Sequence, residues 1–188
     1  SLDQWFFWGA AESSNITNGN TTVQSGNSQY AYIPTTLGAN SGKYYWEIKP
    51  SARNGGTDDL LVGVTSTQAV STVQTLGWHP NAMDLDNNKL YFSKNGVWQN
   101  SGDPTSGSTG TGAIPLTASA STELGNYFAS VAYVNGSYNA TFQANFGNGF
   151  FGTSAVADNS TATASTPGTF NYDVPAGYQP LTTKGLNA

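Results

Sequence analysis

One short acidic and amide-rich segment is the first place where the residue types suggest metal chemistry. Four potential oxygen ligands stand close together there, at Asp84, Asp86, Asn87 and Asn88. Hard cations such as Ca²⁺ take several carboxylate and carbonyl oxygens, but a calcium loop of the EF-hand kind also needs Gly at its sixth position and Glu at its twelfth. This segment has neither. Because Asp and Asn also stabilise tight turns, the sequence predicts a hairpin turn here, with no metal and no cofactor.

Glu47 is the residue that would serve glycoside hydrolysis. A retaining glycosidase needs two carboxylates about 5 Å apart. Side chains two positions apart share a strand face, but Glu47 has Tyr45 and Lys49 at those positions, and the other glutamates lie far away in the sequence. We therefore expect Glu47 to be a structural carboxylate, hydrogen-bonded within a sheet or paired with Lys43 or Lys49, because buried charges are normally paired. A lectin-fold glycoside hydrolase is kept as a minor alternative.

Two further motifs argue against catalysis. Residues 147–152 match the pattern G-x-G-x-x-G, yet a dinucleotide site needs a helix to open at that loop, and a Ser/Thr/Ala-rich stretch follows instead. These glycines favour a tight turn at the end of a strand. His79 is the single histidine, and no G-x-S-x-G motif accompanies it. The sequence therefore predicts a protein that is not an enzyme.

The elements that would position these residues are strands. In residues 42–50, Tyr44, Trp46 and Ile48 alternate with polar neighbours and would share one face of a sheet. Residues 60–64 form a nearly continuous apolar run, which is typical of a central sandwich strand.

Turn signals join the strands. Asn95-Gly96 separates residues 89–93 from residues 96–99 and predicts a hairpin with a type I′ turn, because both turn residues tolerate positive φ. Residues 127–134 and 140–146 are predicted to be another strand pair, split by a short polar segment. Three stretches are predicted to be loops, namely 54–59, 102–112 and the long segment 153–168.

Composition limits the class of protein. The 188 residues are 37% hydrophobic, which suits a single domain over residues 1–188 with a real core. Charged residues make up only 9%, and a net charge of −5 leaves no basic surface for phosphates, so nucleic-acid binding is excluded. No apolar run approaches the ~20 residues of a membrane span. The aromatic residues 5–8 predict that residues 1–14 form a docked N-terminal strand or a segment that anchors to another chain.

The order of several motifs carries a family resemblance. G-K-Y-Y-W-E-I at residues 42–48 precedes V-G-V at residues 62–64, and the hairpin sequence D-L-D-N-N-K-L-Y-F-S-K-N-G follows at residues 84–96. This order resembles the SPRY (B30.2-like) domain, and A-T-F-Q-A-N-F-G at residues 140–147 is similar to the closing strand of that family. The resemblance implies an all-β fold, a two-sheet antiparallel β-sandwich of the concanavalin A-like jelly-roll kind.

The two ends of the resembling region are similar to SPRY-like modules of bacteriophage proteins. They are N-G-N-T-T-V at residues 18–23 and F-N-Y-D-V-P-A-G-Y-Q-P-L at residues 170–181. The resemblance implies a non-catalytic binding or structural module of a phage virion, in a tail fibre, a spike or a capsid decoration. Such a module would recognise a host-surface glycan or a neighbouring virion protein through its loops. Uncharged Asn, Ser, Thr and Tyr side chains suit that role, because they offer adaptable hydrogen bonds and rigid aromatic contacts.

Candidate ligand-binding residues are polar or aromatic residues of the predicted loops and strand ends. They are Asn54, Asp58, Asp59, Trp78, His79, Asp103, Tyr133, Asn135 and Tyr138. The alternative function is a purely architectural virion subunit that self-assembles into a homo-oligomer, through its strand edges and residues 5–8.

Overall fold

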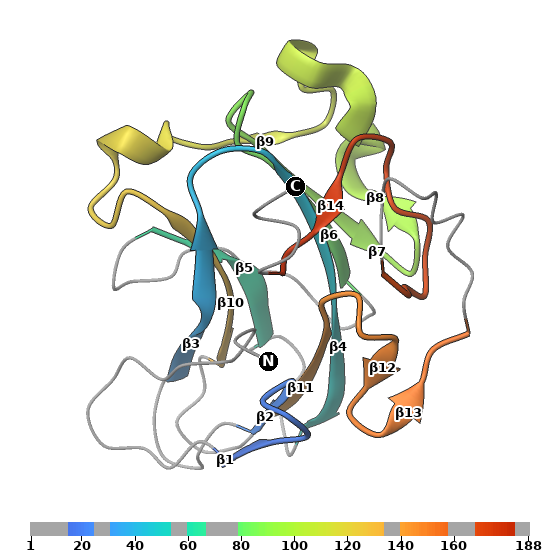
Figure 1. The fold of residues 1–188 in the computed structure, drawn as a ribbon. Coiled ribbons are helices and arrows are strands. Elements are labelled where there is room, and N and C mark those ends of the chain that lie inside the picture. The colour runs from blue at the N-terminus through green and yellow to red at the C-terminus, as the bar shows by residue number, and fades with distance from the viewer. Residues whose placement is uncertain are drawn as a thin grey trace.

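A computed structural model describes residues 15–24, 31–53, 60–66, 79–133, 140–157 and 168–182 of the 188-residue chain. These residues form an all-β sandwich of two antiparallel sheets, as predicted (Figure 1). Residues 1–14, for which we predict a strand or an anchor, lie outside the described residues. Among the described residues no helix is long and apolar enough to cross a membrane.

The larger sheet has nine strands within the described residues. Its main path runs β1 (Asn15–Thr17), β2 (Thr22–Gln24), β11 (Ala140–Asn145), β4 (Lys43–Arg53), β6 (His79–Asp84), β7 (Lys89–Lys94) and β8 (Val97–Trp98). Two short strands join this path: β9 (Ile114–Pro115) pairs with β7, and β14 (Gln179–Pro180) pairs with β4 in the parallel direction.

The smaller sheet faces the larger one. Its described strands are β3 (Ala31–Ala39), β10 (Tyr127–Tyr133) and β5 (Leu60–Thr65), in that order. A separate hairpin joins β12 (Phe150–Phe151) to β13 (Ser154–Ala155). Three short 3-10 turns complete the described elements, η1 (Gln99–Ser101), η2 (Pro104–Thr109) and η3 (Ser119–Ser121).

The main core lies between the two sheets. The alternation of β4 is as predicted, because Tyr44, Trp46 and Ile48 all belong to this core. Val131 of β10 and Phe142 of β11 join them from opposite sheets, and both are fully buried. Burying a large apolar side chain contributes about 1.5–3 kcal/mol, so this layer supplies most of the driving force for folding.

A second apolar cluster lies on the outer face of the larger sheet. Tyr45, Ala82 and Tyr91 come from the sheet, and Phe170 and Tyr178 come from the C-terminal part of the chain. All five are buried, and the Tyr45 and Phe170 rings meet edge to face with centroids 4.9 Å apart. The C-terminal residues therefore cover a sheet face that would otherwise be exposed.

The predicted hairpin at Asn95-Gly96 is confirmed. Asn95 has φ 52° and Gly96 has φ 80°, the two positive values that a type I′ turn requires, and β7 pairs with β8 across it. The turn predicted at residues 86–88 joins β6 to β7.

Three sequence predictions need correction. Residues 127–134 and 140–146 were predicted to pair with each other, but β10 pairs with β3 and β5, whereas β11 pairs with β2 and β4. β10 and β11 therefore belong to different sheets, and side chains of both strands fill the core between those sheets. Residues 60–64 are buried as predicted, but within the described residues β5 pairs with β10 alone, so it ends the smaller sheet. The segment 153–168 is not all loop, since β13 begins at Ser154.

Candidate functional site

The best-formed exposed feature in the described part of the chain is a long polar loop, residues 99–113, called the polar loop below. It leaves the sheet after β8 and returns at β9, and both strands pair with β7. Figure 1 shows it in yellow-green, projecting from one end of the sandwich. The sequence predicts a loop at residues 102–112, and the structure adds that η2 lies within this segment and that η1 directly precedes it.

Asp103 shapes the middle of the polar loop. Its Oδ1 atom accepts hydrogen bonds from the backbone N–H of Thr105 at 2.8 Å and from the Thr105 hydroxyl at 2.6 Å. These two bonds hold the pKa of the Asp103 carboxyl below its ordinary value, the hydroxyl bond contributing most. The carboxylate thereby caps the first turn of η2.

Ser106 closes the loop on itself. Its hydroxyl donates to the Asp103 carbonyl at 2.6 Å and accepts from the Thr111 N–H at 2.9 Å. The Asp103 N–H in turn donates to the Thr111 carbonyl at 3.0 Å. Gly112 has φ 67°, and a Cβ atom there would lie 2.4 Å from the Asn100 carbonyl oxygen, so only glycine fits. These contacts within the polar loop contribute to its shape.

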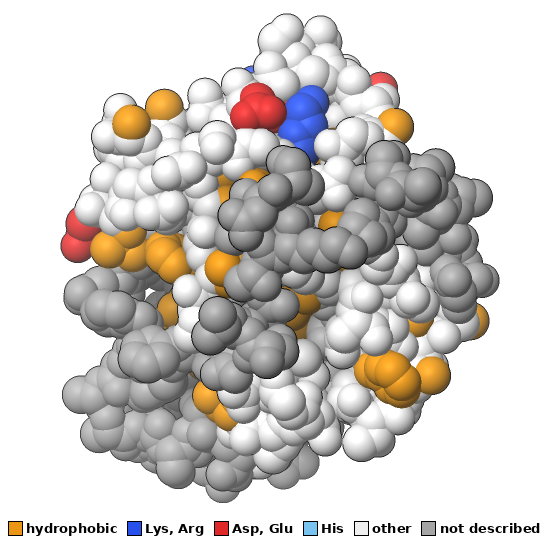
Figure 2. Space-filling view, in the orientation of Figure 1, with side chains coloured by type: hydrophobic (Ala, Val, Ile, Leu, Met, Phe, Trp, Pro, Cys, Tyr) orange, Lys and Arg blue, Asp and Glu red, His pale blue; other side chains and the backbone are white. Residues whose placement is uncertain are grey.

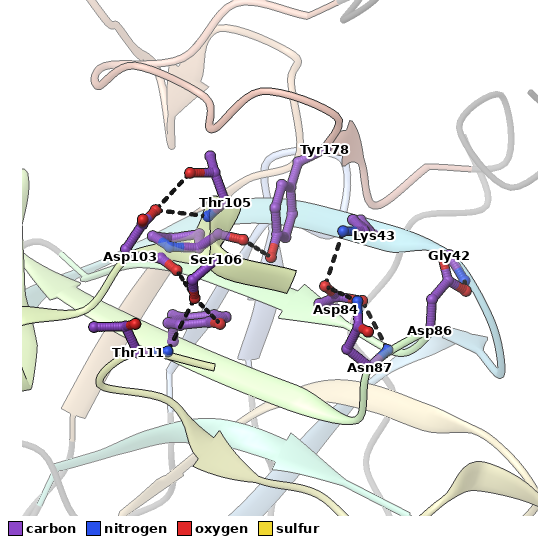
Figure 3. Close-up of polar contacts among 12 residues, drawn as sticks. Gly42, Lys43, Asp84, Asp86, Asn87, Asp103, Thr105, Ser106, Thr111 and Tyr178 are labelled. Carbon is purple, nitrogen blue, oxygen red and sulfur yellow. Dashed lines mark hydrogen bonds and ion pairs between the residues drawn. The ribbon is translucent and has the colours of Figure 1, made fainter. Parts of the chain in front are cut away.

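Two buried tyrosines contact the polar loop, and Figure 3 labels one of them, Tyr178. The Tyr178 hydroxyl donates to the Pro104 carbonyl at 3.0 Å, and the Tyr91 hydroxyl lies 3.3 Å from Ser106 Oγ. Burial strongly raises the pKa of Tyr178, which keeps its hydroxyl protonated as a hydrogen-bond donor. Sequence reasoning missed both tyrosines, because nothing local in the sequence tells a supporting aromatic residue from an ordinary core residue.

The acidic and amide-rich segment at residues 84–88 lies near these tyrosines. Asp84 is fully buried and its Oδ2 atom lies 2.9 Å from Lys43 Nζ. Asp84 also accepts hydrogen bonds from the backbone N–H and the side-chain amide of Asn87, at 3.0 and 2.8 Å. Asp86 accepts a bond from the Gly42 N–H at 2.7 Å. These carboxylates link two turns, and the described residues contain no group of three or more His, Cys, Asp or Glu side chains that could hold a metal ion.

Glu47 is buried on the outer face of the larger sheet, where only 1% of it is exposed. Each of its two oxygens accepts two hydrogen bonds. Oε1 accepts from the Tyr45 hydroxyl and the Tyr172 N–H, at 3.0 and 2.9 Å. Oε2 accepts from the Asn145 amide and the Asn171 N–H, at 3.1 and 2.9 Å.

The hydrogen-bonded structural role predicted for Glu47 is confirmed by these four contacts. The alternative pairing with Lys43 is not seen, because Lys43 pairs with Asp84 instead. Burial raises the pKa of Glu47 more than the four hydrogen bonds lower it. Because both oxygens of Glu47 accept hydrogen bonds from the protein, this carboxylate links β4 to residues 145, 171 and 172.

The structure describes three of the nine predicted ligand-binding residues, and these three lie on different elements. Asp103 lies in the polar loop, His79 begins β6 at the end opposite Asp84, and Tyr133 ends β10. The other six lie outside the described residues: Asn54, Asp58, Asp59, Trp78, Asn135 and Tyr138. Strand register nevertheless pairs Arg53 with Ala140 and Leu60 with Tyr133. The segments 54–59 and 134–139 therefore start and end at neighbouring residues.

The remaining sequence motif is a turn, as predicted. Gly147, Gly149 and Gly152 of the G-x-G-x-x-G pattern all have positive φ. The last of them lies in the β12–β13 hairpin, where a Cβ atom would meet the Gln143 side chain at 2.4 Å. These glycines therefore serve a strand exit.

Comparison with known proteins concerns the fold. The chain is similar to the SPRY domain of human HERC1, with a TM-score of 0.49 and 14% sequence identity, over 70% of this chain and 91% of that one. The sequence matches no protein-family model and no curated protein sequence. The fold class therefore rests on the strand pairings described above.

Proposed function

We propose that this protein is a non-catalytic recognition module, whose polar loop contacts a host-surface glycan or a neighbouring protein of a phage virion. The observation that carries the proposal is the construction of the polar loop. It projects from the sandwich (Figure 1), and it carries exposed Ser, Thr and Asn residues on a hydrogen-bonded frame. A loop already in one shape loses little conformational freedom on binding, which favours affinity.

The surface chemistry of the loop supports an uncharged partner, and Figure 2 shows few charged side chains on the described part of this face. Its exposed residues include Asn100, Ser101, Thr105, Ser108 and Thr109, and Asp103 is its single ionisable residue. Hydroxyl and amide groups can donate and accept hydrogen bonds, so they suit neutral hydroxyl-rich ligands and polar protein surfaces alike.

A binding role also fits the use of the acidic side chains. The Glu47, Asp84 and Asp86 carboxylates are engaged by donors of the protein itself. General acid–base catalysis needs carboxyl groups that reach a substrate, and these three carboxylates contact the protein's own donors instead.

The virion setting rests on the resemblance of residues 18–23 and 170–181 to bacteriophage modules. In a tail fibre or spike, repeated copies of one module would bind together, so that weak single sites add up to strong attachment. In a capsid decoration the same loop would face a neighbouring subunit.

The test is a glycan array, together with adsorption to candidate bacterial host cells, for the parent protein and for Thr109→Lys. Thr109 is exposed in the polar loop, and a lysine there adds bulk and charge without removing any hydrogen bond described above. We expect Thr109→Lys to lose at least tenfold in binding. The matched control is Thr153→Lys, the same change at an exposed turn between β12 and β13, which should bind like the parent.

Two outcomes would contradict the proposal. Equal losses of binding in Thr109→Lys and Thr153→Lys would show that the polar loop is not the binding surface. A parent protein that binds no glycan and no cells, but that light scattering shows to be a stable oligomer, would favour the architectural subunit instead.

A further inference from the structure

The C-terminal residues 168–182, called the strap below, cross the outer face of the larger sheet. Figure 1 shows the strap in red-orange, running past β4 and ending at β14. Its first part is fixed by Glu47, which accepts the N–H groups of Asn171 and Tyr172. Its last part is fixed by β14 and by the Leu181 N–H, which donates to the Tyr45 carbonyl at 3.2 Å. The strap is therefore attached to the sheet at both ends.

Tyr178 lies between these two attachments and reaches the polar loop. Its side chain is fully buried, in the cluster with Tyr45 and Tyr91. The hydroxyl donates to the carbonyl of Pro104, the first residue of η2, across 74 positions of sequence. Lys43 Nζ lies 5.9 Å from the centre of the Tyr178 ring on the sheet side. The ring thus fills the space between the sheet and the loop.

The Pro104 carbonyl is the point where the strap acts on the loop. Pro104 is buried, so without the Tyr178 hydroxyl its carbonyl would have to find another donor. Asp103, which caps η2 and bonds to Ser106 and Thr111, is the residue directly before it. A shift of Pro104 toward water would therefore displace the frame of the whole loop.

We propose that the strap sets the shape of the polar loop, with Tyr178 as the positioning residue. The proposal rests on the function proposed above, in that the shape being held is the one that meets the partner. The competing account is that the internal bonds of Asp103 and Ser106 suffice, so that the loop keeps its shape whatever the strap does.

The experiment is hydrogen–deuterium exchange on the free protein, comparing the parent with Tyr178→Phe. This change deletes one hydroxyl and keeps the ring. We expect amide exchange in residues 103–111 to become about three- to tenfold faster, the effect of losing one net hydrogen bond. Exchange in β11 serves as the reference for global stability.

The matched control is Tyr127→Phe. Tyr127 is also buried, and its hydroxyl also donates to a loop carbonyl, that of Thr117 at 2.8 Å. This variant should speed exchange near residues 117–122 and leave residues 103–111 at the parent rate. A polar loop that exchanges at the parent rate in Tyr178→Phe would overturn the proposal, as would an equal acceleration of the loop and β11.

Because exchange is measured without a ligand, the two proposals fail separately. Faster loop exchange in Tyr178→Phe, in a protein that binds neither glycan nor cells, would support the role of the strap and contradict the recognition function. Unchanged loop exchange in Tyr178→Phe, in a protein whose loop does bind a glycan, would contradict the role of the strap and support the recognition function.

Discussion

Glu47 and Tyr172 lie 125 positions apart in the sequence, and the Tyr172 N–H donates to Glu47 Oε1 at 2.9 Å. Together with the adjacent bond from Asn171, this contact fastens the strap to the middle of β4. The carboxylate that the sequence predicts to be structural is therefore a long-range link between β4 and the strap. Stability should depend on the ionisation of this one group.

The first prediction concerns pH. Burial raises the pKa of Glu47 above its ordinary value of 4.5, so the folded protein holds this proton more tightly than the unfolded chain does. The contribution of the group to stability is therefore full below 4.5 and is lost as the pH rises through the raised folded pKa. Glu47→Gln should abolish this decline, although it lowers stability throughout by removing an acceptor.

Urea denaturation from about pH 4 to pH 8 measures the decline, as the difference in unfolding free energy between parent and variant. Glu123→Gln is the control, because Glu123 is exposed, and its pH profile should follow that of the parent. A Glu47→Gln profile parallel to that of the parent would show that the Glu47 pKa is not raised.

The second prediction concerns Asn145, which is fully buried and links four partners. Its amide donates to Glu47 Oε2 and to the Thr169 carbonyl, and its oxygen accepts from the N–H groups of Gly147 and Gly149. Asn145→Ala leaves all four without this partner, so we expect a loss of about 2–4 kcal/mol in unfolding free energy. Asn126 is half-buried and its amide makes a single described hydrogen bond, to the Leu124 carbonyl at 3.2 Å, so Asn126→Ala should cost no more than about 1 kcal/mol. Similar losses in the two variants would refute the role of Asn145.

The third prediction concerns Gly112 of the polar loop. Gly112→Ala combines an unfavourable positive φ with a clash against the Asn100 carbonyl. Gly125→Ala has nearly the same φ, 66°, but its Cβ would meet nothing within 4 Å. We expect Gly125→Ala to cost about 1 kcal/mol by thermal denaturation, and Gly112→Ala to cost at least twice that. Equal costs would show that the close approach at Gly112 is relieved freely.

The fourth prediction concerns the pair formed by Lys43 and Asp84. Lys43→Met removes the cation beside a buried carboxylate, and we expect a loss of about 1–3 kcal/mol, since Lys43 itself is partly exposed to solvent. The double variant Lys43→Met/Asp84→Asn should lose less than the sum of the two single variants, because it leaves no unpaired charge. A strictly additive double variant would show that the two groups do not interact.

Local sequence patterns determined much of the fold. The alternation in residues 42–50 placed Tyr44, Trp46 and Ile48 on the core face, because successive side chains of a strand point to opposite sides. Asn95-Gly96 determined a hairpin, because few other pairs tolerate two positive φ values. Both are properties of a few neighbouring residues, so they can be read without knowing the rest of the chain.

Only the tertiary structure decided which strands pair and what the polar side chains do. Residues 127–134 and 140–146 have the pattern of a hairpin, yet β10 and β11 belong to different sheets. The Asn171 and Tyr172 N–H groups that donate to Glu47 lie 124 and 125 positions away from it, and Tyr178 lies 74 positions from Pro104. The hydrophobic effect has no direction and does not depend on sequence distance, so many strand pairings satisfy the same local pattern. The pairing that the chain adopts is set by how the whole core packs.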